Sequence, residues 1–247
     1  MNKIIYLYNQ NNVSSQDKLY DIILSFFKSI ETTLVIIFLN YFFNDSLNTN
    51  DTIEINEKNL SKNNYIPLDY SLSSISFTVN DEYIYSIEIQ DKAKNNFSFH
   101  LLKYKKIPEE ANYFINLPES KIIEFEDNIY TSDKFRYNVK LYNHTLSYDI
   151  PVYKFFKKDL DFIKSNNLYI LFPFISLFSD YSKIINASKI GSKNETFKNE
   201  ILKIGANAYK DIKKIASYSD VFTKRDYCII KDTIAEIIDY YLESIET

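Results

Sequence analysis

The chain has 247 residues, of which 45% are hydrophobic and 25% are charged, so it can bury a core and bulk disorder is disfavoured. Its formal net charge is −4, which counts against tight DNA binding, because nucleic-acid binders usually carry a basic balance or a basic patch. The single cysteine, Cys228, excludes an internal disulfide framework and a multi-cysteine zinc site, and its helical surroundings predict a buried structural thiol.

The apolar segments are too short to indicate a membrane protein. The first residues lack the apolar core and small-residue cleavage site of a secretory signal. The longest apolar run, Thr33 to Phe43, is about half of a membrane span. We therefore expect a cytoplasmic protein without a membrane partner.

The first predicted element is helical and covers residues 17 to 43. Apolar residues recur there at helical spacing, and the run from Leu34 to Phe43 is apolar on all sides, as in a buried helix. Residues 44 to 71 are polar and rich in asparagine, and we expect a loop with a short strand at Thr52 to Ile55. This loop comes just before the segment of chemical interest, so a flap over a site is one interpretation.

Residues 72 to 90 predict a β-hairpin, because two runs alternate apolar and polar side chains with a period of two. A two-residue turn would mix polar and apolar residues on each face of the hairpin. A three-residue loop, Asn80 to Glu82, places Ser74 opposite Glu88 and keeps the polar side chains together, so we prefer that register.

The remaining elements complete an alternation of helix, strands and helices. Within residues 94 to 115 we expect a helical segment, FSFHLLKYKKI, that ends near Pro108. It is followed by a strand at Lys121 to Asp127, a hairpin at about 135 to 155, a helical stretch at 159 to 178 with a break near Pro173, and helices at 195 to 245. This order predicts an α/β (α+β mixed) fold, with a central mixed sheet flanked by helices and a helical C-terminal region.

Three stretches carry a likeness to a known family. The hairpin ends in IEIQ (Ile87 to Gln90), residues 148 to 174 read YDIPVYK to LYILFPF, and residues 222 to 242 form a C-terminal helical pattern. These stretches resemble the PD-(D/E)XK nuclease superfamily in its transposase-associated branch. The first is similar to the E-x-Q variant of the superfamily's E-x-K motif. The second is similar to the V-P-V-x-K strand and the leucine-rich run ending L-L-P-F, and the third to the last helix of the family. With the similar strand at 116 to 125, the resemblance covers most of the chain.

The resemblance implies a Mg²⁺-dependent DNA endonuclease that acts in DNA recombination. It implies a restriction-endonuclease-like domain over residues 1 to 183 and a helical C-terminal region over residues 184 to 247. In the superfamily an Asp and a Glu on adjacent strands hold Mg²⁺, which prefers carboxylate oxygens and activates the water that attacks the phosphodiester. The Lys or Gln two residues after the Glu orients water or phosphate.

Aligned this way, the catalytic set is Glu88, Gln90 and Ser74, and Ser74 stands where the family carries its Asp. Serine is a neutral and weak Mg²⁺ ligand, so Glu88 alone should bind the metal poorly. Asp69 replaces the missing carboxylate only if the strand bulges, because alternation points it to the opposite face. Glu31, from the early helix, is a second acid that would complete a metal site with Glu88.

Other polar residues have both a functional and an ordinary interpretation. His100 stands where the family usually carries an Arg, and it either contacts phosphate when protonated or is a partly buried helical side chain. Lysines at 103 to 106, 154 to 158 and 213 to 214 would suit phosphates, but interleaved acids favour solvated faces. The tyrosines between residues 65 and 85 either stack on bases or pack, and packing is the default in a chain with 22 tyrosines.

Two functional classes follow. The first is an active Mg²⁺-dependent endonuclease whose partner is DNA. The second is a pseudo-enzyme, an inactive descendant that binds DNA or a protein partner through the inherited scaffold. A structural role and a homo-oligomer are left open.

Overall fold

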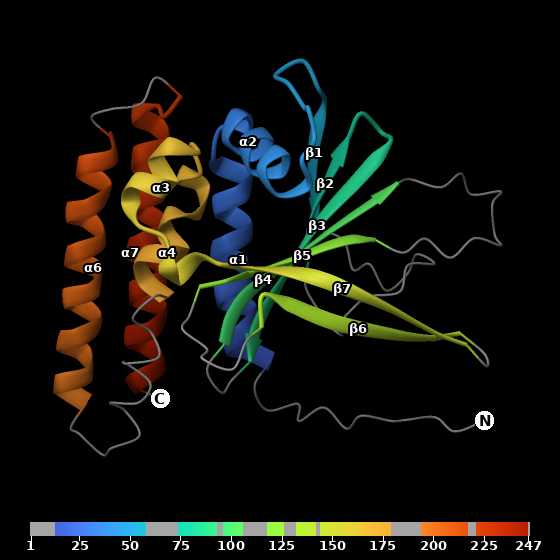
Figure 1. Ribbon diagram of the computed structural model, residues 1–247. Coiled ribbons are helices and arrows are strands. Elements are labelled where there is room, and N and C mark those ends of the chain that lie inside the picture. The colour runs from blue at the N-terminus through green and yellow to red at the C-terminus, as the bar shows by residue number, and fades with distance from the viewer. Residues whose placement is uncertain are drawn as a thin grey trace.

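The computed structural model describes residues 13–57, 74–92, 96–105, 118–125, 132–141, 144–178, 194–216 and 221–246. These residues form a mixed α/β fold, as the sequence predicts, with one seven-stranded mixed sheet and six α-helices. The helices gather on one side of the sheet (Figure 1).

The helices are α1 (Val13–Ser29), α2 (Thr32–Phe43), α3 (Leu160–Ser165), α4 (Phe172–Phe178), α6 (Asn194–Ala216) and α7 (Lys224–Glu246), with the 3-10 turns η3 (Phe155–Lys157) and η4 (Tyr169–Leu171). The strands are β1 (Ile53–Glu57), β2 (Ser74–Val79), β3 (Tyr83–Lys92), β4 (Asn96–Lys105), β5 (Glu119–Glu124), β6 (Lys134–Leu141) and β7 (His144–Lys154). The short early strand, the later hairpin and the C-terminal helices were predicted and are confirmed. The strand predicted at Lys121 to Asp127 is also present, as β5, but it begins and ends earlier, at Glu119–Glu124.

The strand order in the sheet is β1-β2-β3-β4-β5-β7-β6. All neighbouring strands are antiparallel except β5 and β7, which are parallel. The predicted register of the β2–β3 hairpin is confirmed, because Ser74 pairs with Glu88 and the connection is the three-residue loop Asn80–Glu82. Asn80 and Asp81 have positive φ angles of 51° and 55°, which Asn and Asp tolerate better than most residues.

One hydrophobic core lies between the sheet and the helices. Strand alternation directs Ile75, Phe77 and Val79 of β2 into it, where the Phe27 ring of α1 contacts the rings of Phe77 and Phe174 at 5.6 and 6.5 Å. Buried residues of α6 and α7 belong to the same cluster. The expected boundary after residue 183 therefore divides helices that share one core with the sheet.

The prediction of a helical segment at 94 to 115 is wrong where the structure describes it, because residues 96–105 form strand β4. Phe97, Phe99 and Leu101 face the main core, while Leu102 and Tyr104 face a second, smaller cluster on the other side of the sheet. A strand that is buried on both faces loses its simple alternation and resembles a buried helix in sequence.

Two predicted helical regions contain breaks. The region from 17 to 43 is two helices that meet at 107° around Ser29–Glu31. No single helix in the described part of the chain is long and apolar enough to cross a membrane. Taken together, the two helices of this bent pair have the length and composition of a membrane span. Pro173 lies in the first turn of α4, which tolerates proline, and the chain breaks earlier, at Asn167 with its φ of 53°.

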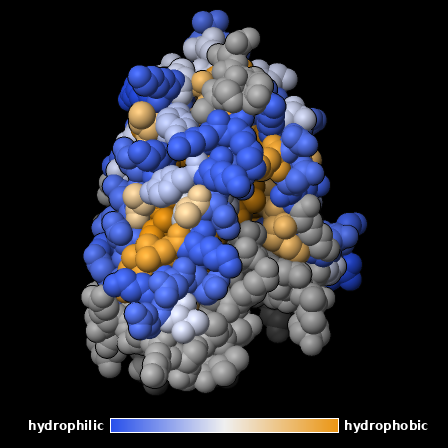
Figure 2. Space-filling model, turned by 90° about the vertical axis from the view of Figure 1, so that its left-hand side faces the viewer, coloured by the Kyte–Doolittle hydropathy of each residue, from blue (hydrophilic) through white to orange (hydrophobic). Residues whose placement is uncertain are grey.

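Cys228 is exposed, so the predicted buried thiol is wrong. The buried stripe of α7 includes Ile230, Ile234 and Ile237. Cys228 lies two residues before Ile230, about 200° around the helix, and therefore on its outer side. On the α6 side, the surface of the molecule is mostly hydrophilic with small hydrophobic areas between the polar side chains (Figure 2).

Candidate polar site on the sheet

The face of the sheet opposite the helices carries a row of buried polar side chains. Ser74 of β2 pairs with Glu88 of β3, and Glu88 pairs with His100 of β4, so the three side chains lie side by side on that face. Nine polar or charged side chains are buried in the described residues, and seven of them lie on this face. They are Ser74, Ser76, Ser86, Glu88, Ser98, His100 and Ser120.

Glu88 and His100 are the charged centre of this row. Their residues are only 1% and 4% exposed, and His100 Nδ1 lies 3.5 Å from Glu88 Oε2. Within the described residues, neither that oxygen nor either ring nitrogen of His100 makes a hydrogen bond. Because buried polar atoms are normally hydrogen-bonded, this pair is the most unusual polar feature of the sheet.

A second set of polar residues is paired one step further along these strands. Gln90, at the end of the E-x-Q motif, pairs with Ser98, and Ser98 pairs with Glu124 of β5. Glu124 in turn pairs with Lys154, the lysine of IPVYK, across the parallel β5–β7 pair. Sequence reasoning did not select Glu124. The even spacing of Ser120, Ile122 and Glu124 along β5 was the signal that could have placed it on this face.

The donor set around Glu88 does not suit Mg²⁺. The neighbours of this carboxylate in the row are a serine hydroxyl and an imidazole, whereas Mg²⁺ is held mainly by carboxylate oxygens and water. Imidazole is instead a ligand of zinc, copper, iron or nickel. Among the described residues, no three His, Cys, Asp or Glu side chains come together closely enough to hold a metal ion.

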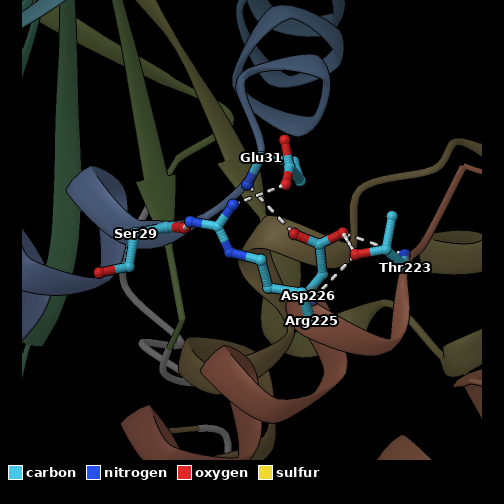
Figure 3. Close-up of polar contacts among 5 residues, drawn as sticks. All are labelled: Ser29, Glu31, Thr223, Arg225 and Asp226. Atoms are coloured by element: carbon cyan, nitrogen blue, oxygen red, sulfur yellow. Dashed lines mark hydrogen bonds and ion pairs between the residues drawn. The ribbon is translucent and has the colours of Figure 1, made fainter.

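Glu31 lies apart from this row, at the corner between α1 and α2 (Figure 3). Its carboxylate accepts a hydrogen bond from Arg225 at 3.0 Å, and its backbone amide donates to Asp226 at 3.1 Å. This corner packs on the helix side, whereas Glu88 projects from the other face, so the sheet separates the two carboxylates. The structure thus gives no support to a shared metal site of Glu31 and Glu88. Asp69, the other acid considered as a replacement for the missing Asp, lies outside the described residues.

The predicted lysine clusters are largely paired with acids. Salt bridges join Lys103 to Asp45, Lys105 to Glu82, Lys154 to Asp133 and Lys214 to Asp211. Lys158 lies over the Phe162 ring, 4.3 Å from its centroid. These contacts favour the interpretation of the clusters as ordinary charged surface.

Tyr85, one of the tyrosines considered for base stacking, is packed in the core. Its hydroxyl donates to Asp45 Oδ2 at 2.7 Å, and Asp45 Oδ1 lies 2.5 Å from Lys103 Nζ. Burial, reinforced by the Asp45 carboxylate, raises the pKa of Tyr85 well above its ordinary value.

Comparisons of the chain with protein-family models, with curated proteins and with solved structures found no match.

Proposed function

We propose that this chain is a PD-(D/E)XK nuclease-like protein of the transposase-associated branch that has lost its Mg²⁺ centre and acts by binding a protein partner. The observation that carries this proposal is the surroundings of Glu88. The carboxylate that would hold the metal stands between Ser74 and His100, with no second acid beside it in the row.

The chemistry of phosphodiester hydrolysis explains why these neighbours matter. The reaction needs a metal that activates water and stabilises charge on the phosphate. One carboxylate supplies only one of the negative ligands that compensate Mg²⁺ for its lost water. A protonated His100, 3.5 Å from Glu88, would add positive charge where the cation has to bind. We therefore expect the native site around Glu88 to bind Mg²⁺ weakly.

Charge supports a protein partner over DNA. Affinity for DNA comes mainly from lysine and arginine contacts to phosphates. Here four lysines of the candidate clusters already pair with Asp or Glu, and the net charge of the chain is −4. Each phosphate contact by one of these lysines would first have to break an ion pair.

A second candidate, an active Mg²⁺-dependent endonuclease, is favoured by one observation. Ser74 lies directly opposite Glu88, which is the relationship that the family requires of its Asp and Glu, and Gln90 follows two residues later. Replacing Ser74 by Asp would therefore place a second carboxylate beside the first without a change in register.

The test is nicking of supercoiled plasmid in Mg²⁺ or Mn²⁺ by the native chain, Ser74→Asp and Ser74→Asp/Glu88→Ala. We expect the native chain to be inert, Ser74→Asp to nick, and the double variant to be inert again. Nicking by the native chain that disappears in Glu88→Ala would replace the proposal with the second candidate. If Ser74→Asp is folded but also inert, the nuclease ancestry loses its main support.

DNA binding is tested separately, with a labelled duplex in metal-free buffer. We expect no retention of the duplex at about 0.15 M salt, where long-range attraction between exposed charges is screened. Binding that persists at that salt concentration and falls steeply as salt rises would make DNA the partner instead.

A further inference from the structure

The β6–β7 hairpin, at one edge of the sheet, has an apolar face. Pairing across the hairpin places apolar or aromatic residues opposite one another three times in succession. The pairs are Phe135 with Ile150, Tyr137 with Tyr148, and Val139 with Leu146. All three pairs lie on the same face as Glu88 and His100, because Ile150 belongs to the small cluster on that face.

This face is anchored at one end and exposed along its length. Ile150 is buried with Ile84, Leu102 and Tyr104 in the small cluster, and Tyr137 and Tyr148 pack against it with ring centroids 5.5 Å apart. Phe135 and Leu146 are 50% and 44% exposed. Only three large hydrophobic residues are exposed in the described chain, and two of them lie on this one hairpin. A hydrophobic surface concentrated in this way marks an interaction site.

Among the described strands, β6 is also an edge of the sheet. In the described strand order it pairs only with β7, and it is eight residues long. A long edge strand with apolar residues is a template for another strand unless something covers it. A peptide that adds to such an edge gains backbone hydrogen bonds and places alternate side chains on the two faces.

The second face of β6 is basic. It carries Lys134 and Arg136, and β6 has no acidic residue. Across the hairpin, the only charged partner of this row is Asp149, which accepts a hydrogen bond from Arg136 Nε at 2.9 Å. The edge therefore offers an apolar row on one face and a net positive row on the other.

We infer that β6 receives an extended strand of a partner protein in which apolar residues alternate with acidic ones. Apolar side chains would cover Phe135 and Tyr137, and an acidic side chain would lie beside Lys134. Two copies of β6 would instead place basic residues against basic residues, which is destabilising across a strand pair. The inference rests on the proposed protein-binding function and names the chemistry of the partner.

The experiment measures fluorescence anisotropy of two labelled probe peptides. One alternates glutamate with valine over the eight-residue length of β6, and the other alternates lysine with valine. We expect the native chain to bind the glutamate peptide at least about tenfold more tightly, because opposite charges across a strand pair are favourable and like charges are not. The reversal Lys134→Glu, which leaves the Arg136–Asp149 pair intact, should abolish or invert the preference.

Phe135→Ser tests the apolar face, and Leu202→Ser is its matched control on α6, where Leu202 is 46% exposed. We expect Phe135→Ser to weaken binding of the glutamate peptide several-fold and Leu202→Ser to leave it unchanged. Equal binding of both peptides, or a preference that charge reversal does not change, overturns the inference. Sedimentation that shows self-association abolished by Phe135→Ser also overturns it, in favour of a second copy.

The two proposals can fail independently. None of the hairpin substitutions touches Ser74 or Glu88, so plasmid nicking by Ser74→Asp reports on the nuclease site alone. Peptide binding reports on the edge alone.

Discussion

Asp226, in the first turn of α7, accepts a hydrogen bond from the backbone amide of Glu31, 195 residues earlier in the chain. The same carboxylate accepts hydrogen bonds from the backbone amide and the hydroxyl of Thr223 at 3.0 and 2.6 Å, and Thr223 Oγ1 accepts in return from the Asp226 amide (Figure 3). One fully buried side chain therefore satisfies amides at the starts of two helices that are far apart in sequence.

We predict that Asp226→Ala lowers the free energy of unfolding by about 2–4 kcal/mol, because it leaves the partly buried backbone amides of Thr223 and Glu31 without their acceptor. Thr223→Ala should cost about 1 kcal/mol, as for other caps. Urea denaturation of the three proteins measures both values.

Arg225→Met is the control at the same corner. Its ion pair with Glu31 is exposed, with 67% and 41% of the two side chains accessible, so we expect a loss below about 1 kcal/mol. An Arg225 effect as large as that of Asp226 would contradict the assignment of the corner's stability to the buried carboxylate.

A second prediction concerns the Glu88–His100 pair. His100→Leu leaves a carboxylate that is 1% exposed without the imidazole that lies 3.5 Å from it, so we expect a loss of about 3 kcal/mol or more. Adding Glu88→Met should recover part of this loss, because the double variant no longer buries a carboxylate without a partner. A double-mutant cycle from urea denaturation measures the coupling, and a coupling near zero would show that the contact contributes nothing.

A third prediction concerns the approach of α6 to α7. A Cβ built on Gly205 would lie 2.2 Å from Cδ1 of Ile238, so alanine at this position requires that side chain to move. In an Ile238→Val background, which lacks Cδ1, Gly205→Ala should stabilise the protein by up to about 1 kcal/mol through helix propensity. In the native background the displacement of Ile238 should cancel or reverse that gain. Equal effects in the two backgrounds, measured by thermal and urea denaturation, would contradict close packing at this point.

A fourth prediction concerns alkaline pH. The pKa of Tyr85 is raised in the folded protein by burial, so its hydroxyl stays protonated after the same tyrosine in the unfolded chain has ionised. The stability contributed by this shift is complete below the unfolded pKa of about 10 and is lost as pH rises above it. We expect the free energy of unfolding to fall between about pH 9.5 and 11. The fall should be less steep in Tyr85→Phe, and the two slopes should differ by up to about 1.4 kcal/mol per pH unit. Identical slopes would show that Tyr85 ionises equally in both states.

The β2–β3 hairpin could be predicted down to its residue pairs, because its two strands alternate and only one loop length keeps the polar residues together. The same logic failed one strand later. In β4, Leu101 and Leu102 are both buried because each face of the strand meets a different cluster, and this removes the alternation that identifies a strand.

The error in β4 hid the centre of the candidate site. With residues 94 to 115 taken as helix, His100 had no fixed relation to Glu88, although the two are paired neighbours in the sheet. The position of Glu31 was unpredictable for a different reason. It depends on Arg225 and Asp226, which approach it only after the last helix has packed against the α1–α2 corner.

The packing of α7 on α1 also has a consequence for the order in which the protein folds during synthesis. The two helices share one core although about 200 residues separate them, so the side of α1 that contacts α7 has no complete cover until residues 224–246 have been synthesised. Contacts of such long sequence separation slow folding, because the loop between them must close before they form. The nascent chain therefore exposes the apolar face of α1 until α7 has been made, and an exposed apolar face of this kind is what chaperones bind.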